Sequence, residues 1–179
     1  MSKSVKQKNS QANPIRTVII IAVLTALSVV VSYFLTFRVG NVMKLSPVFI
    51  ITALAGYKFG ICGAVTISVL ADMIQYMLFP SNGFSIGIFL SNVVLGLIFG
   101  LCFYKKFSFV KILIAATSSQ ILCTILIPTY FWVYVEKWYP TIDVIIYPRI
   151  LQGGIMFVVM IVSLYLLFIK TDLIKKIKL

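Results

Sequence analysis

Hydrophobic residues along this chain fall into long runs, and short polar breaks separate one run from the next. A helix needs ~20 mostly apolar residues to cross a bilayer core ~30 Å thick, and most of the runs have about that length. Barrel strands would alternate apolar and polar positions, whereas these runs are continuous. The pattern therefore predicts an all-α integral membrane protein with six transmembrane helices, at about residues 15–36, 46–57, 60–79, 84–104, 108–134 and 146–169.

The predicted helices form one membrane domain with a basic tail at each end. The domain covers residues 15–170, and the tails cover residues 1–14 and 171–179. The first tail is too polar for a cleaved signal peptide, which needs an apolar stretch followed by a small-residue cleavage site. We therefore interpret the first apolar run as a retained membrane helix.

Composition supports a membrane protein and argues against an enzyme. Charged residues make up 11% of the chain, against ~25% in a typical soluble domain. The chain has no histidine, so the commonest general base is absent. Its three cysteines, Cys62, Cys102 and Cys123, lie far apart and lack the spacing of a zinc site. We therefore expect no catalytic residue, no metal and no cofactor.

Basic residues are distributed unequally between the two sides that six spans would create. Of the 16 lysines and arginines, 12 fall on the side of both termini, and the other side receives Arg38, Lys44, Lys137 and Arg149. The positive-inside rule then places both termini in the cytoplasm. The net charge of +12 thus indicates topology and attraction to an anionic lipid bilayer. Nucleic acid is not expected as a partner, because the basic residues are scattered over short loops.

Asp72 is an acid inside an apolar run, eight residues before the Pro-Ser-Asn-Gly break at 80–83. A charged Asp near the centre of a membrane helix costs ~2.5–3.5 kcal/mol, so such residues face a protein interior or a wet cavity. Gln75 and Tyr76 follow at i+3 and i+4 on the same face. This face is typical of a ligand pocket. The alternative is that Asp72 bonds a neighbouring helix and fixes packing.

Arg149 opens the sixth run, directly after Pro148, with Gln152 at i+3 on the same face. The planar fork of arginine can bind a carboxylate through two hydrogen bonds. Alternatively, Arg149 is an interfacial anchor whose charge reaches the headgroups. Lysine takes that role at the other helix ends, which favours an anionic ligand at Arg149.

The predicted outer loops add further candidates for ligand binding. Residues 36–46 contain Arg38 and Lys44, with Gly40 as a candidate hinge for a lid, and Asn82 lies in the break that follows Asp72. Most aromatics of the fifth connection are interpreted as an interfacial belt, with one or two free to stack on a flat ligand. These aromatics are Tyr130, Phe131, Trp132, Tyr134, Trp138 and Tyr139.

Small residues recur at i+4 spacing, which lets membrane helices approach closely. Ala22 and Ala26 form such a pair in the first run, and two glycine pairs, 56/60 and 96/100, have the same spacing. Packing inside the protein is the default interpretation of all of these pairs.

Taken together, these features resemble the substrate-binding S-components of energy-coupling factor (ECF) vitamin transporters. The resemblance covers nearly the whole chain and is strongest to the folate-specific branch. The motifs that carry it are the run LAGYKFGICGAVTISVLADMIQYMLFPSNGFSIGIFLSNVVLGLIFGLCFYKK at 54–106 and the sequence Pro148-Arg149-Ile150-Leu151. The chain departs from the branch at Ile61, Gln75 and the pair Gln152-Gly153.

The resemblance implies an S-component-like bundle that binds folate from outside in a bacterial cell membrane. It implies partners as well: a transmembrane coupling subunit, which would dock at Ala22 and Ala26, and two ATPase subunits. The residues expected to bind the ligand are Arg38, Lys44, Asp72, Gln75, Tyr76, Asn82, Arg149 and Gln152. Asp72 would accept from the pterin N–H groups, and the basic residues would bind the glutamate tail.

Three other functions remain open on the sequence. The chain could be an S-component for another vitamin or cofactor precursor, such as riboflavin, thiamine or a queuosine precursor. It could be a structural membrane subunit without a ligand, or a small membrane enzyme with Asp72 as its base. The enzyme is disfavoured because only one acid lies deep in an apolar run.

Overall fold

The computed structural model describes residues 14–39, 43–78, 84–105 and 107–170, and helices make up nearly all of it. The two strands and the longer helices are α1 (Pro14–Phe34), β1 (Phe37–Val39), β2 (Met43–Leu45), α2 (Phe49–Leu78), α3 (Ile86–Phe103) and α6 (Asp143–Leu164). The fifth run is divided into α4 (Phe109–Ser119), η2 (Gln120–Leu126), α5 (Ile127–Tyr130) and η3 (Phe131–Val135), where η marks π-helical turns. A last π-helical segment, η4 (Tyr165–Lys170), continues α6.

Five of the described helical segments are long and apolar enough to cross a membrane. This confirms the predicted all-α membrane fold, although the count of six helices is not confirmed. The predicted second and third helices are the two halves of α2, which bends at Gly60, with φ 69° and ψ −151°. Glycine tolerates this backbone conformation because it has no Cβ.

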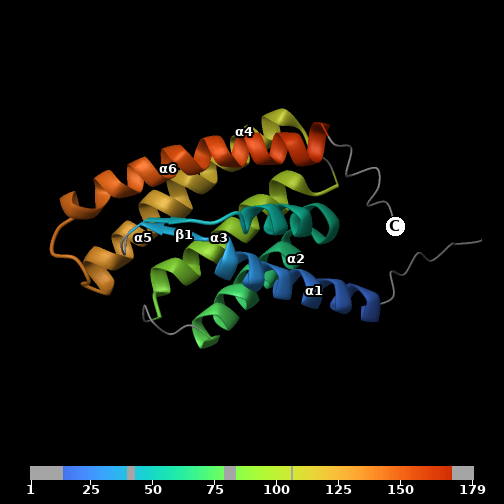
Figure 1. Ribbon diagram of the computed structural model, residues 1–179, viewed down its shortest axis with the longest axis horizontal. Coiled ribbons are helices and arrows are strands. Elements are labelled where there is room, and N and C mark those ends of the chain that lie inside the picture. The colour runs from blue at the N-terminus through green and yellow to red at the C-terminus, as the bar shows by residue number, and fades with distance from the viewer. Residues whose placement is uncertain (1–13, 40–42, 79–83, 106, 171–179) are drawn as a thin grey trace, which may run out of the picture.

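The helices lie roughly side by side along the long axis of the molecule (Figure 1). α1 begins at the same end of the bundle at which α6 ends, and we call this the terminal end. The opposite end, which holds η3 and the start of α6, is the distal end (Figure 1). The described ends of the first and last helices thus agree with two termini on one side of the membrane.

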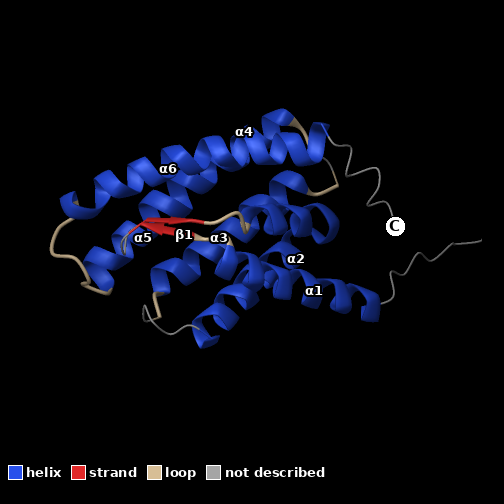
Figure 2. Cartoon of the chain, viewed as in Figure 1, coloured by secondary structure: helices blue, strands red, loops and turns tan. Residues whose placement is uncertain are grey.

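A two-stranded hairpin connects α1 to α2 and is the only sheet among the described residues (Figure 2). Its strands are antiparallel, and Arg38 and Lys44 are Cα partners at its middle position. β2 packs against α6. The sequence did not predict this hairpin, because strands of three residues carry too little alternation to be recognised.

Glycines let the backbones of α2 and α3 approach each other closely. A Cβ at Gly100 would lie 2.5 Å from the Cα of Ile61, and one at Gly96 would lie 2.7 Å from the Cα of Val65. Gly56 likewise faces the backbone of Phe99. The glycine pairs therefore serve packing inside the protein, as the sequence predicted.

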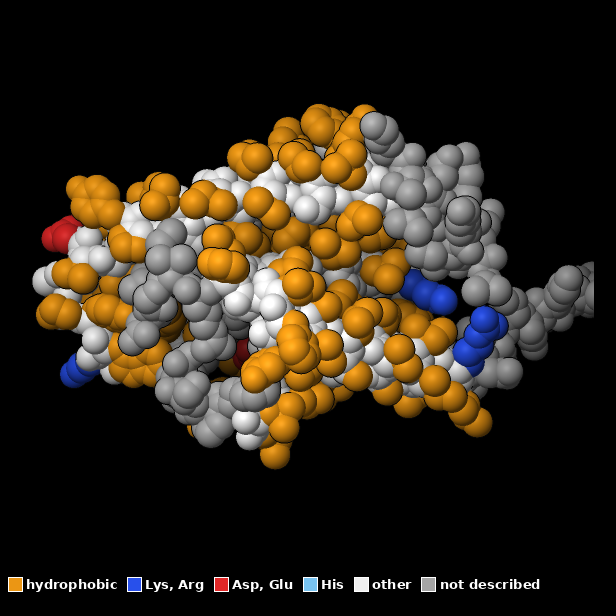
Figure 3. All heavy atoms as spheres, viewed as in Figure 1, with side chains coloured by type: hydrophobic (Ala, Val, Ile, Leu, Met, Phe, Trp, Pro, Cys, Tyr) orange, Lys and Arg blue, Asp and Glu red, His pale blue; other side chains and the backbone are white. Residues whose placement is uncertain are grey.

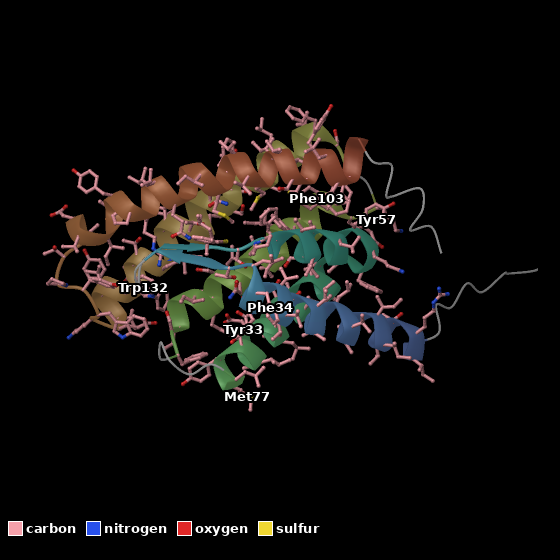
Figure 4. All side chains as sticks on the ribbon, viewed as in Figure 1. Tyr33, Phe34, Tyr57, Met77, Phe103 and Trp132 are labelled. Atoms are coloured by element: carbon pink, nitrogen blue, oxygen red, sulfur yellow. The ribbon has the colours of Figure 1, made fainter. Side chains whose placement is uncertain are left out.

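Aromatic side chains fill the core at the terminal end. Phe107 stacks on Phe103 at 4.6 Å and on Phe168 at 4.3 Å between ring centroids, and we call these three residues the Phe stack. Phe103 is fully buried. Figure 4 shows Phe103 near Tyr57 and far from Trp132, which lies at the distal end.

Candidate functional site

The acidic face predicted on the third helix lies on the second half of α2. Asp72 is half-buried and stands six residues before the end of α2, ~9 Å along its axis. Gln75 accepts a hydrogen bond of 2.5 Å from the Ser32 hydroxyl on α1. Tyr76 is partly exposed and meets Phe84 edge to face, at 5.2 Å between centroids. Gln75 thus links two helices, and Tyr76 packs beside the start of α3.

The surface of the molecule is hollowed on one face. Figure 3 shows a recess with hydrophobic side chains along the described part of its border and an acidic side chain visible inside it. Elsewhere on this face the charged side chains of the described residues lie toward the two ends of the bundle (Figure 3).

Arg149 is buried on α6, with only 6% of its surface exposed. Its Cζ lies 4.1 Å from the ring centroid of Trp132, and its Nη1 donates to the Thr124 carbonyl at 3.4 Å. Within the described part of the chain, its Nε has no hydrogen-bond partner, and no carboxylate forms an ion pair with Arg149. Gln152, one turn further along, is buried to the same extent. The described contacts of Arg149 therefore leave its charge without a counter-ion.

The start of α6 explains how the guanidinium reaches this position. α6 begins at Asp143, so Arg149 lies ~9 Å inside the helix, too deep for a residue that only anchors the helix end. Pro148, in the second turn of the helix, is half-buried beside it. A buried side chain favours a role inside the protein over an interfacial anchor, which would hold its charge in the headgroup region.

A network of hydrogen bonds holds Trp132 in place beside Arg149. The Trp132 Nε1 donates to the Ser85 hydroxyl at 3.0 Å, and this hydroxyl donates to Glu136 Oε1 at 2.9 Å. Glu136 Oε1 also accepts from the Gly87 backbone N–H at 3.3 Å. Ser85 caps α3 by accepting from the backbone N–H of Ile88. The network therefore joins the start of α3 to η3 and, through Trp132, to α6.

Sequence reasoning did not assign the members of this network to the site. Trp132 is one of six aromatics for which the sequence leaves open a place in the belt or a stacking role; it is 4% exposed, whereas Tyr130 and Tyr134 are each 57% exposed and fit the belt. Glu136 received no role, although it is one of only four acids in the chain. That scarcity was the available signal, because a rare acid beside a membrane span needs a physical reason.

Other predicted ligand residues are described only in part or lie outside the described residues. Arg38 and Lys44 occupy paired backbone positions in the hairpin. Asn82 and the candidate hinge Gly40 lie outside the described residues. The structure thus brings Arg149 and Gln152 together on one buried face, and it places Asp72, Gln75 and Tyr76 on another helix. A ligand role for each of these residues stays a prediction.

Ala22 and Ala26, the residues expected to dock a partner, are both exposed on α1. The buried side of the same helix carries Thr25, Ser28 and Ser32. The alanine pair therefore points away from the described core, and packing inside this chain does not explain it.

Comparisons with known proteins agree on one family. The family described as "ECF transporter, substrate-specific component" matches residues 16–174. The folate transporter FolT of Clostridium novyi (strain NT) is 26% identical over 152 residues, which cover 84% of this chain and 87% of that protein. A crystal structure of FolT bound with folic acid superposes with a TM-score of 0.75 at 26% identity, covering 85% of this chain and 92% of the other.

Proposed function

Because the chain belongs to the family of substrate-specific components of ECF transporters, we propose that it captures folate with high affinity on the extracellular side of a bacterial membrane. A component of this kind binds and transports its substrate, so the chain is a membrane transport protein and not an enzyme. The folate specificity is supported by the similarity to FolT proteins, one of which was crystallised with folic acid.

The buried guanidinium of Arg149 is the observation that carries the proposal. A buried charge costs several kcal/mol unless a partner of opposite charge offsets it. The described residues supply no such partner, and Nε still has a hydrogen to donate. A carboxylate arriving with the ligand would supply both the charge and the acceptor. Folate carries two carboxylates on its glutamate tail and therefore fits this requirement.

The remaining parts of folate match the other predicted residues. Its pterin ring presents adjacent N–H groups, which would donate hydrogen bonds to the carboxylate of Asp72. Gln75 or Tyr76 would form the remaining hydrogen bonds along the edge of the ring. Gln152 lies next to Arg149 and offers an amide to the tail. Arg38 and Lys44 would add positive charge near the entrance, and Asn82 would add an amide. Both ends of the ligand would thus find polar groups inside an apolar bundle.

Delivery across the membrane would depend on partner chains. The sequence contains no GxxxxGK[ST] loop, so ATP hydrolysis would come from two ATPase subunits. The exposed pair Ala22 and Ala26 would dock on a transmembrane coupling subunit, against which this chain would reorient. Both termini would face the cytoplasm, in agreement with the lysine and arginine distribution.

Ligand identification and one substitution test the proposal. Protein purified in mild detergent and then denatured is expected to release folate in stoichiometric amount, identified by absorbance and mass. Arg149→Ala is expected to weaken folate binding about 100-fold, but to change little for 6-hydroxymethylpterin, a pterin fragment that carries no carboxylate. Arg16→Ala is the matched control, because Arg16 is exposed at the terminal end.

Other outcomes separate the alternatives. Release of riboflavin or another vitamin would retain the transporter assignment and overturn folate. Equal affinity of the Arg149→Ala variant and the parent for folate would remove Arg149 from the site. If no ligand is released and added folate does not raise the melting temperature, folate binding is contradicted.

A further inference from the structure

Trp132 is enclosed to a degree that an aromatic belt or a ligand-stacking role does not explain. The guanidinium of Arg149 lies over its ring, and the ring of Tyr139 stacks with it at 5.8 Å and 23°. Trp138 adds a second ring, also at 5.8 Å. With 4% of its surface exposed, Trp132 has no free face on which a ligand would stack. Its described neighbours instead make it a platform for Arg149.

The Ser85 hydroxyl fixes the orientation of that platform. It accepts from the Trp132 Nε1 at 3.0 Å and from the Ile88 N–H at 3.2 Å, and it donates to Glu136 Oε1 at 2.9 Å. These three bonds use its single donor and both of its lone pairs. The hydroxyl therefore has one orientation, and the indole N–H is directed with it.

Glu136 strengthens this arrangement by adding its charge. A hydrogen bond that ends on a carboxylate is stronger than a neutral one, and a hydroxyl that donates strongly also accepts more strongly. The same oxygen receives the Gly87 N–H in the first turn of α3, where the helix dipole favours negative charge. Glu136 thus fixes the start of α3, Ser85 and the indole in one connected unit.

We propose that Ser85 and Glu136 are positioning residues of the ligand site, which orient the Arg149 guanidinium through Trp132. The inference rests on the proposed function, since it assigns Arg149 to a carboxylate of the ligand. A guanidinium binds a carboxylate through two hydrogen bonds only when its plane is aligned with the ligand. The platform sets that plane, so loss of the Ser85 hydroxyl misaligns Arg149 without touching the ligand.

The test compares the affinities of folate and of 6-hydroxymethylpterin, which has no carboxylate, for variants of the full-length chain. Ser85→Ala is expected to weaken folate binding about tenfold and binding of the pterin fragment less than twofold, while Ser85→Thr, which keeps a hydroxyl, restores most of the affinity. Ser91→Ala is the matched control, because Ser91 is also buried on α3 but donates to the Gly87 carbonyl within its own helix. This control is expected to bind both ligands like the parent.

A second substitution covers the case in which Ser85→Ala does not fold. Trp132→Phe keeps a buried ring beside Arg149 and removes the N–H that Ser85 accepts. It is expected to show the same selective loss of folate affinity. Equal losses for folate and 6-hydroxymethylpterin would mean that the network supports the whole site, and unchanged affinities would mean that it does not act on Arg149. Either result overturns the proposal.

A measurement without ligand separates this inference from the proposed function. The chain has two tryptophans, so Trp138→Phe leaves Trp132 as the sole source of indole fluorescence. In that background, Ser85→Ala and Arg149→Ala are both expected to shift the emission, because each removes a contact of the same ring. An unchanged emission in Ser85→Ala overturns the positioning role. A shift in a protein that fails to bind folate supports the platform and contradicts the proposed ligand.

Discussion

The two ends of the bundle have cores of opposite chemistry. At the terminal end, the Phe stack closes the core with stacked apolar rings. At the distal end, the guanidinium of Arg149 is buried, and the half-buried Glu136 has one carboxylate oxygen out of contact with solvent. The Phe stack is complete within the chain, whereas Arg149 Nε and Glu136 Oε2 lack hydrogen-bond partners among the described residues.

This difference indicates that the terminal end of the bundle contributes mainly to stability and the distal end mainly to ligand binding. Packed aromatic rings stabilise a fold without any further partner. Buried and incompletely paired polar groups reduce stability, and proteins retain them where a ligand completes the pairing. We therefore expect substitutions at the terminal end to change the stability of the fold, and substitutions at the distal end to change ligand binding.

The largest expected effect on stability is at the terminal end. Phe103→Ala removes a fully buried ring and should lower the free energy of unfolding by about 3–5 kcal/mol. Thermal unfolding in detergent measures this loss. Leu101→Ala is the control, because Leu101 is 65% exposed two residues away and should change the melting temperature little. Similar melting temperatures for the two variants would contradict the comparison.

The second-largest effect on stability is expected at the contact between α2 and α3. Gly100→Ala would place a Cβ 2.5 Å from the Cα of Ile61, so α2 and α3 must separate, at a cost of about 1–3 kcal/mol. Gly154→Ala meets nothing within 4 Å and should gain up to about 1 kcal/mol from its higher helix propensity. Thermal unfolding of both variants tests the opposite signs, and destabilisation of equal size would refute the close approach.

Arg149→Met should separate stability from function at a single residue. Replacing a buried, unpaired charge by an apolar side chain of similar length is expected to raise the stability of the ligand-free protein by about 1 kcal/mol. The same variant should lose the stabilisation that folate gives the parent, measured as the shift in melting temperature on adding folate. A large drop in stability without ligand would show that Arg149 is a packing group instead.

The smallest expected effect concerns the link between α1 and α2. Ser32→Ala removes the hydrogen bond to Gln75 and should cost about 1 kcal/mol of stability. Ser118→Ala serves as the comparison, because the Ser118 hydroxyl donates to Ile114 O in its own helix. The folate affinity of Ser32→Ala should show whether Gln75 serves packing or ligand binding. An unchanged affinity in Ser32→Ala would assign Gln75 to packing, and a changed one would place it near the ligand.

Much of the fold could be predicted from the sequence because a bilayer restricts the backbone so strongly. A continuous apolar run must satisfy its own hydrogen bonds in lipid, so it forms a helix. The runs at 84–104 and 108–134 accordingly match α3 at 86–103 and the segment 109–135 closely. The sequence predicted two helices where the structure has the single bent helix α2. The residues near Gly60 indicate a break in the helix, but they do not indicate whether hydrogen bonding continues across it.

The site was only half predictable, and the missing half is non-local. Arg149 and Gln152 share a face at i, i+3, which any helix imposes. Trp132 contacts Ser85 across 47 positions, and Glu136 reaches Ser85 across 51. No local pattern indicates contacts between residues so far apart in the chain, so the sequence could assign neither Trp132 nor Glu136 to the site.

Lipid disfavours unpaired backbone groups and charges wherever they occur along a chain, so the order of residues alone identifies a helical membrane protein and the helix faces that carry its few polar residues. The burial of Arg149, its support by Trp132 and the absence of a described carboxylate beside it become visible only in the folded chain. These properties depend on how α3, η3 and α6 meet, because burial and pairing arise from packing between segments that are distant in the chain.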